Sequence, residues 1–221
     1  VNPSGLTALE RPTAHVGHQY HFLSTEITDQ TALLGIPTRL GNFGLMVHRY
    51  GLQDIYNEIH IGFAYAKQFG RELSLAVRIN AHQLGISNYG TTRTFSADMG
   101  LQYHTAQGLI IGLHYLNVGG INYAHGLGAL PSTVRLGASY RLDKVTVTSD
   151  VVYDRIRAAN GHLGLEYAII TSLLLRGGVS VHPLQQHAGF GLVWGQMVVD
   201  VAATFQHYLG ISPQIGISYA F

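Results

Sequence analysis

Two absences narrow the class of this protein before any motif is considered. The chain of 221 residues has no cysteine, which excludes disulfides, thiol nucleophiles and cysteine-ligated metal sites. Only 11% of its residues are charged, about half the usual share. The net charge is +1, and the two lysines lie far apart in the sequence. A nucleic-acid-binding surface is therefore excluded.

The chain also lacks a long hydrophobic run. Its longest stretch without Asp, Glu, Lys or Arg extends from Met99 to Val134, and Gln102, Asn117 and Pro131 interrupt it. No segment therefore predicts a membrane-spanning helix. Low charge without such a helix is typical of the strands of a membrane barrel, because alternation dilutes their hydrophobicity. The 27 glycines and 13 tyrosines agree with this interpretation.

The carboxyl end has the pattern of a barrel strand. Ile215, Ile217, Tyr219 and Phe221 alternate with small or polar residues. The final residues of a soluble protein are more often frayed and polar. A strand that closes an outer-membrane barrel needs apolar side chains toward lipid and an aromatic residue at the interface. These four residues therefore predict a C-terminal barrel strand.

Alternation of apolar and polar residues continues along the whole chain, with no convincing helical stretch. It predicts fourteen strands, at residues 13–23, 30–38, 41–50, 55–68, 71–84, 93–105, 108–118, 132–142, 144–155, 160–169, 172–182, 187–194, 196–207 and 212–221.

The predicted links between these strands alternate in length. Links after even strands are very short, as at Arg39-Leu40 and Leu142-Asp143, whereas links after odd strands are longer, notably Leu84–Thr92 and Val118–Pro131. An even strand number with short turns on one side is the layout of outer-membrane barrels. A soluble sandwich with Greek-key crossings has no such two-sided rule.

The alternation also separates charged from apolar side chains. Mid-strand charges all fall on the small or polar face, which predicts that they face the lumen; they are Glu58, Arg78, Asp98, Arg135, Asp150, Glu166, Arg176 and Asp200. An Arg or Lys that faces lipid near the midplane costs roughly 2–4 kcal/mol. This cost explains why the sorting is one-sided.

Aromatic residues on the apolar face occur at similar heights. They lie near the short-turn ends of the even strands and predict a girdle at the periplasmic interface, made of Tyr65, Tyr103, Tyr140, Tyr167, Trp194 and Tyr219. The core of a soluble sandwich would not place one aromatic per even strand at one height.

Taken together, these patterns predict an all-β protein, a 14-stranded antiparallel transmembrane β-barrel of the outer-membrane type. We expect residues 1–221 to form one domain in a bacterial outer membrane, with residues 1–12 as an N-terminal lead-in segment. Because the chain begins at Val1 without an apolar leader, we interpret it as a mature or truncated form.

Two short motifs resemble a known family. Asn2-Pro3-Ser4-Gly5-Leu6 is similar to the segment that precedes the first strand in the FadL-like superfamily of outer-membrane barrels. The segment from Pro131 to Gly137 resembles one that opens a central strand in PorV/PorQ-like proteins of type IX secretion. The resemblance implies a barrel that transports fatty acids or assists secretion. The resemblance assigns no binding residue to this chain.

Opposite charges on neighbouring strands predict structural ion pairs. A tight turn at Leu142-Asp143 would set Arg135 opposite Asp150, and a turn at 170–172 would set Glu166 opposite Arg176. Cross-strand pairs of opposite charge stabilise a sheet and fix its register. We prefer this interpretation to a conduction path lined by the same charges.

Cofactor and enzyme hypotheses find little support. His60, His82 and His104 share the predicted inward face of three strands, and His162 and His182 are also inward. However, the sequence has no HExxH and no histidine pair backed by carboxylates. It also has no recognisable Ser, His and acid constellation. We therefore predict no metal, no cofactor and no catalysis.

Three functions remain open from the sequence. The first is a non-catalytic accessory subunit of an outer-membrane secretion or protein-assembly machine, with membrane lipid and other outer-membrane or periplasmic proteins as partners. The alternative is a passive channel for small hydrophobic compounds. The third, a soluble β-sandwich binding module, is disfavoured by the charge sorting. The modest loops and an inner face with few large hydrophobic residues slightly favour the first.

Overall fold

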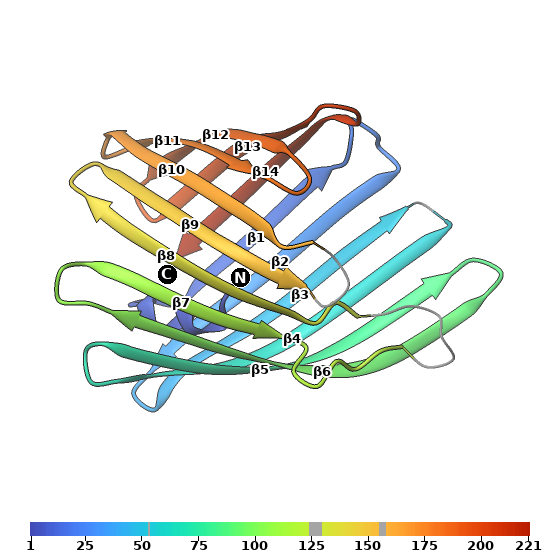
Figure 1. Cartoon of the computed structure of the whole chain (residues 1–221), viewed down its shortest axis with the longest axis horizontal. Helices are drawn as coiled ribbons and strands as arrows, with labels where there is room; N and C mark the ends of the chain where they lie inside the picture. The colour runs from blue at the N-terminus through green and yellow to red at the C-terminus, as the bar shows by residue number, and fades with distance from the viewer. Residues whose placement is uncertain (53, 124–129, 155–157) are drawn as a thin grey trace.

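The barrel is seen in a computed structural model that describes residues 1–52, 54–123, 130–154 and 158–221. Fourteen antiparallel strands form one closed sheet (Figure 1), as the alternation predicts. The strands are β1 (Thr13–Tyr20), β2 (Ile27–Thr38), β3 (Gly41–Leu52), β4 (Tyr56–Phe69), β5 (Leu73–Ile86), β6 (Gly90–His104), β7 (Leu109–Leu116), β8 (Thr133–Leu142), β9 (Val145–Asp154), β10 (Asn160–Ile170), β11 (Leu173–Ser180), β12 (Gln185–Trp194), β13 (Met197–Gln206) and β14 (Gly210–Ala220).

The first and last strands close the barrel. Each strand pairs with its neighbours in the chain, and β1 also pairs with β14, with Thr13 opposite Ala220 and Val16 opposite Ile217. This closing pair leaves the sheet without a free edge, so every strand has hydrogen-bonding partners on both sides. It also places the start of β1 and the end of β14 on the same side as the turns that follow even strands.

One predicted loop is wrong. Residues Leu84–Thr92 were expected to form a long link, yet β5 and β6 remain paired as far as Ile86 opposite Gly90. The outward side chains here are polar or absent, as at Gln83 and Gly85, so the apolar signal of a strand fades while backbone pairing continues. The link between β7 and β8 does remain long; residues 124–129 within it, including His125 and Gly126-Leu127-Gly128, lie outside the described residues.

Alternation gives the barrel an apolar outer wall. Large hydrophobic side chains are exposed on this wall, for example Phe95 at 66%, Leu136 at 56% and Leu165 at 51%. Such exposure is far beyond that of a soluble monomer and requires an apolar surrounding. No helix among the described residues is long and apolar enough to cross a membrane. The barrel thus has the outer surface of an outer-membrane protein.

The predicted girdle residues lie near the short-turn ends of the even strands. Tyr103, Tyr140, Tyr167 and Tyr219 are each about two-fifths exposed, and Trp194 is 80% exposed. Tyr65 is more covered because its ring packs against Phe43 and its hydroxyl donates to the Leu40 carbonyl at 2.8 Å. In the C-terminal strand, Ile215, Ile217 and Tyr219 also face outward, and Phe221 is 62% exposed.

The N-terminal segment folds back into the barrel. Residues Pro3–Ala8 form a 3₁₀ helix, η1, which contacts β2 to β6 from inside. Asn2 caps this helix, because its side chain accepts a hydrogen bond from the Ser4 backbone N–H. The lead-in segment therefore occupies part of the lumen, an arrangement that the sequence patterns do not reveal.

A new charge should destabilise the barrel more on the outer face of the wall than on the inner face. We expect Leu165→Arg, on the outer face, to lower the free energy of unfolding by roughly 2–4 kcal/mol, because the guanidinium would enter hydrocarbon. Thr148→Arg, on the inner face of neighbouring β9, should cost little, because its side chain projects into the lumen. Urea titration in lipid vesicles measures both. A larger loss for Thr148→Arg would contradict the assignment of the faces.

Candidate functional site

The lumen is the candidate functional site. The N-terminal segment occupies part of it, and Asn2 anchors this segment to the wall. The amide nitrogen of Asn2 donates to the carbonyls of Leu101 on β6 and Leu113 on β7, at 3.0 and 3.1 Å. Its amide oxygen accepts from the Ser4 backbone N–H at 3.1 Å and from the Ser4 hydroxyl at 2.7 Å. One side chain thus joins the N-terminal segment to two strands of the wall.

Glycine in the wall makes this close approach possible. A Cβ on Gly100 would overlap the Asn2 side chain and lie 3.0 Å from the Pro3 ring, and a Cβ on Gly44 would lie 2.7 Å from Leu6. Two polar contacts hold the other side of the segment. The Asn42 side chain donates to the Leu6 carbonyl at 2.5 Å, and the Thr7 and Ser74 hydroxyls lie 2.8 Å apart. The segment is therefore fitted to the wall near its short-turn end.

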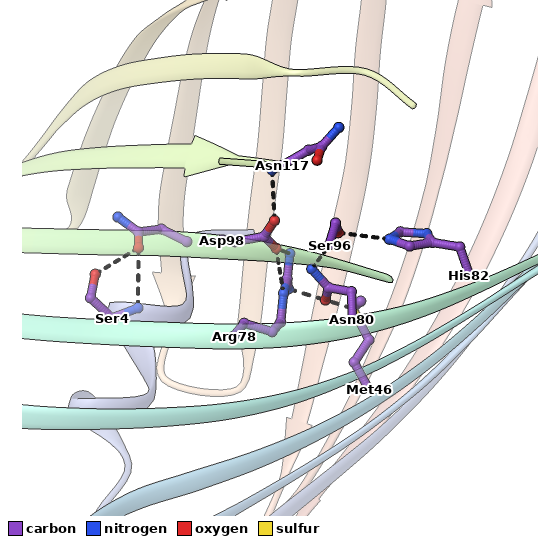
Figure 2. Close-up of polar contacts among 9 residues, drawn as sticks. Ser4, Met46, Arg78, Asn80, His82, Ser96, Asp98 and Asn117 are labelled. Carbon is purple, nitrogen blue, oxygen red and sulfur yellow. Dashed lines mark hydrogen bonds and ion pairs between the residues drawn. The ribbon is translucent and has the colours of Figure 1, made fainter. Parts of the chain in front are cut away.

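A buried ion pair lies next to the N-terminal segment. Arg78 on β5 and Asp98 on β6 face each other in register, and their side chains are 8% and 0% exposed. The Arg78 Nε donates to Asp98 at 2.8 Å, and the second oxygen of Asp98 accepts from the Asn117 backbone N–H at 2.9 Å. Figure 2 shows this carboxylate between the arginine and Asn117. The pair ties β5 and β6 to the start of the β7–β8 link.

Polar side chains continue along the same wall, away from η1. The Asn80 amide donates to the Ser96 hydroxyl at 3.2 Å, and His82 Nε2 lies 2.8 Å from that oxygen (Figure 2). The His82 ring stacks on the His60 ring with centroids 4.4 Å apart. The next strand contributes His48, whose Nε2 lies 2.9 Å from the Asp29 carboxylate. Asp29 is a lumen carboxylate that the strand predictions missed, because 30–38 was assigned too late a start.

The histidines do not form a metal site among the described residues. No group of three or more His, Cys, Asp or Glu side chains there could hold a metal ion. His60 and His82 stack on each other. His104 is the last residue of β6, at its short-turn end, and His162 pairs with Asp150 on the opposite wall. His182 follows the end of β11. The structure brings His60 and His82 together and separates them from the other three histidines.

Aromatic side chains crowd the lumen near the β3–β4 link. The Tyr56 hydroxyl donates to the Glu58 carboxylate, and the Tyr50 and Tyr56 rings pack edge to face with centroids 6.1 Å apart. Tyr123, from the β7–β8 link, is only 7% exposed. Burial raises the pKa of Tyr123 to about 12. The lumen along β3 to β6 is therefore largely filled.

The opposite wall carries a network of ion pairs that lies across the strands. Arg176 on β11 donates from Nε to Glu166 on β10 at 2.7 Å and from its terminal nitrogen to Asp200 on β13. It crosses β12 at Gly191, where a Cβ would lie 2.7 Å from Asp200 and 3.2 Å from Arg176. Register sets Glu166 directly opposite Arg176. Asp200 was predicted to face the lumen, but its pairing across two strands was not anticipated.

The neighbouring pair has a different register from the expected one. Arg135 lies opposite Val152, and Asp150 lies opposite Gly137, because a two-residue turn joins Leu142 to Val145. The prediction that Arg135 sits directly opposite Asp150 is therefore wrong. The long arginine side chain still reaches along the diagonal, with Nε 3.2 Å from the carboxylate, which also lies 2.8 Å from His162 Nδ1.

Space remains beside the Glu166 network. A cavity of about 420 Å³ lies over Gly164, Gly178, Gly189 and Ala202, with Glu166 and Arg176 at its margin. These small residues come from adjacent strands, and Thr146, Thr148, His187 and Gln214 also line the cavity. The lumen thus has a filled side along β3 to β6 and an open side along β9 to β14.

The two kinds of ion pair should differ in strength. Asp98→Asn leaves Arg78 buried without its partner charge, and we expect a loss of about 3–5 kcal/mol in unfolding free energy. In contrast, Arg135 and Asp150 are 44% and 28% exposed, and their coupling should be about 0–1 kcal/mol. Double-mutant cycles with Arg78→Met and Arg135→Met measure both couplings. Equal couplings at the two sites would contradict the difference in burial.

The seat of the N-terminal segment can be tested at Gly100. Gly100→Ala places a methyl group where the Asn2 side chain lies, and we expect it to raise hydrogen exchange at residues 2–9. Gly161→Ala is the control, because its Cβ would meet only Val181 at an ordinary 3.9 Å. Exchange that stays unchanged in Gly100→Ala would mean that the segment is not held at this position.

Comparison with known proteins finds similarity in structure but none in sequence. No family model matches the sequence, and no curated protein matches it. Among solved structures, the toluene transporter TodX of Pseudomonas putida superposes with a TM-score of 0.73 at 11% identity, covering 99% of this chain and 91% of TodX.

Two other structures give the same result. The CymD monoaromatic hydrocarbon channel has a TM-score of 0.73 at 13% identity, with 100% of this chain and 91% of CymD covered. A FadL homologue of Pseudomonas aeruginosa has a TM-score of 0.71 at 11% identity, with 100% and 93% covered. These neighbours are channels, and no finding links the chain to PorV or type IX secretion. The chain has the fold of FadL-type outer-membrane barrels.

Proposed function

We propose that this protein is a passive channel of the bacterial outer membrane for small hydrophobic compounds. The observation that carries the proposal is the arrangement inside the barrel. An N-terminal segment anchored by Asn2 closes one side of the lumen, whereas a cavity of about 420 Å³ remains along the opposite wall. Such a partly filled barrel limits the size of what passes and blocks free diffusion of large solutes.

The cavity suits a small, weakly polar molecule. A cavity of about 150 Å³ is enough to bind benzene, so this one has room for a single aromatic ring and its substituents. Glycine and alanine make up half of its lining, and Thr146, Thr148, His187 and Gln214 add a few hydrogen-bonding groups. The names of TodX and CymD, a toluene transporter and a monoaromatic hydrocarbon channel, support the same class of solute.

The accessory role that the PorV-like resemblance implies has less support. Its partners in the membrane remain a prediction, since the apolar outer wall can pack against lipid or against another barrel. The comparisons favour the channel, because their structures superpose over nearly the whole of this chain. A channel also requires no catalytic group, in agreement with the absence of enzyme motifs from the sequence.

Uptake by vesicles tests the proposal. We expect vesicles with a lipopolysaccharide outer leaflet, which slows hydrophobic solutes, to take up labelled toluene several-fold faster when they contain the folded barrel. Protein-free vesicles and vesicles with heat-unfolded protein are the controls, and heat-modifiable gel migration verifies folding. Uptake no faster than in protein-free vesicles, with the barrel folded, would contradict a channel function.

A further inference from the structure

The charges that face the lumen are unequally balanced. Four arginines of the described strands fall on the inward face. Arg78, Arg135 and Arg176 each form an ion pair with at least one carboxylate, and Arg141, at the short-turn end of β8, donates to the Asp143 carbonyl. Arg176 is shared by Glu166 and Asp200. Two further carboxylates face the lumen: Glu58 accepts from the Tyr56 hydroxyl, and Asp29 pairs with His48. Within the described strands, the lumen therefore contains more carboxylates than arginines.

The positive charges that balance the whole chain lie elsewhere. Both lysines are outside the lumen, with Lys67 on the exposed outer face of β4 and Lys144 in the turn after β8. Arg49 and Arg93 are on the outer face near strand ends, where they donate to Asn57 and Gln83. Consequently the net charge of +1 does not describe the charge of the lumen.

Part of this negative charge lies beside the open cavity, where Glu166 and Arg176 are lining residues and Asp200 is the second partner of Arg176. Glu166, Arg176 and Asp200 together carry a formal charge of −1, and their side chains are 37%, 38% and 30% exposed. They are thus accessible to a solute, in contrast to the fully buried Asp98. The two acidic residues hold the Arg176 guanidinium against β12 at Gly191, through Nε and one terminal nitrogen.

We propose that the lumen discriminates by charge. It admits neutral and positively charged small molecules along the cavity floor that includes Gly164 and Ala202, and it rejects carboxylates. This inference rests on the proposed channel function and specifies its solutes. A carboxylate in the cavity lies beside Glu166, which lines it, and near Asp200, which pairs with Arg176, so it experiences like-charge repulsion inside the barrel. An ammonium group there finds an attractive field, and an uncharged ring is affected little.

Three solutes of one size test the discrimination. Benzyl alcohol, benzylammonium and benzoate share a ring and differ in charge, and the two ions cross a plain bilayer slowly. At pH 7 in lipopolysaccharide-containing vesicles, we expect benzyl alcohol and benzylammonium to enter faster through the barrel than without it. Benzylammonium should exceed benzoate by about tenfold, which corresponds to about 1.4 kcal/mol. A potassium chloride gradient across a planar bilayer should give a cation-selective reversal potential.

Variants identify the residues responsible. Asp200→Asn should reduce the ratio of benzylammonium to benzoate uptake, and the double variant with Glu166→Gln should invert it, because Arg176 is then unpaired. Asp143→Asn makes the same charge change in a turn outside the lumen and should leave the ratio unchanged. Ala202→Leu should slow all solutes by filling the cavity floor. Ala203→Leu adds the same side chain to the outer face and is its control.

The possible failures are distinguishable. If benzyl alcohol enters no faster than in protein-free vesicles, the channel function itself is refuted. If benzyl alcohol enters but benzoate and benzylammonium enter equally, the channel stands and the charge discrimination is overturned. If Ala202→Leu transports as well as Ala203→Leu, the path does not follow this floor. Heat-modifiable migration verifies that each variant is folded.

Discussion

The structure depends on the hydrogen-bonded pairing of β1 with β14. Inside a membrane an unpaired backbone N–H or C=O costs several kcal/mol, so a sheet that crosses it must close. Closure fixes an inside and an outside for every strand, and the period of two then assigns each side chain to one of them. Charge sorting, the aromatic girdle and the apolar outer wall all follow from this one constraint. The lumen is what remains for function.

Within the lumen, small residues decide where larger groups lie. Gly44 and Gly100 admit the N-terminal segment on one side, and Gly191 lets Arg176 cross to Asp200 on the other. The first arrangement fills the barrel, whereas the second keeps its charges flat against the wall and leaves space above. Glycine therefore has different consequences on the two sides of the barrel. On one side it makes room for the N-terminal segment, and on the other it lets an ion network lie against the wall and leave space beside it.

The sequence predicts what depends on local alternation and misses what depends on distant contacts. Strand number, facing of the charges and the girdle could be read from the period of two, because burial acts on each strand separately. The position of Asn2 could not, since its partners Leu101 and Leu113 are about a hundred residues away. The offset of Arg135 from Asp150 reflects the exact length of one turn, and a single-residue error in a turn changes every pair in the hairpin. Leu84–Thr92 shows a third limit, because a strand whose outer face is polar carries no alternation to detect.

The difference between the two ionic clusters connects stability with selectivity. The Arg78–Asp98 pair is sealed from solvent and satisfied by Asn117, so it contributes to holding the wall and the β7–β8 link but offers nothing to a solute. Glu166, Arg176 and Asp200 are partly exposed, and for that reason they stabilise the barrel less. Under the proposed charge discrimination, their exposure is also what would allow them to act on a molecule in the cavity. In a narrow barrel, charges that are free to select solutes are therefore necessarily those that contribute least to the fold.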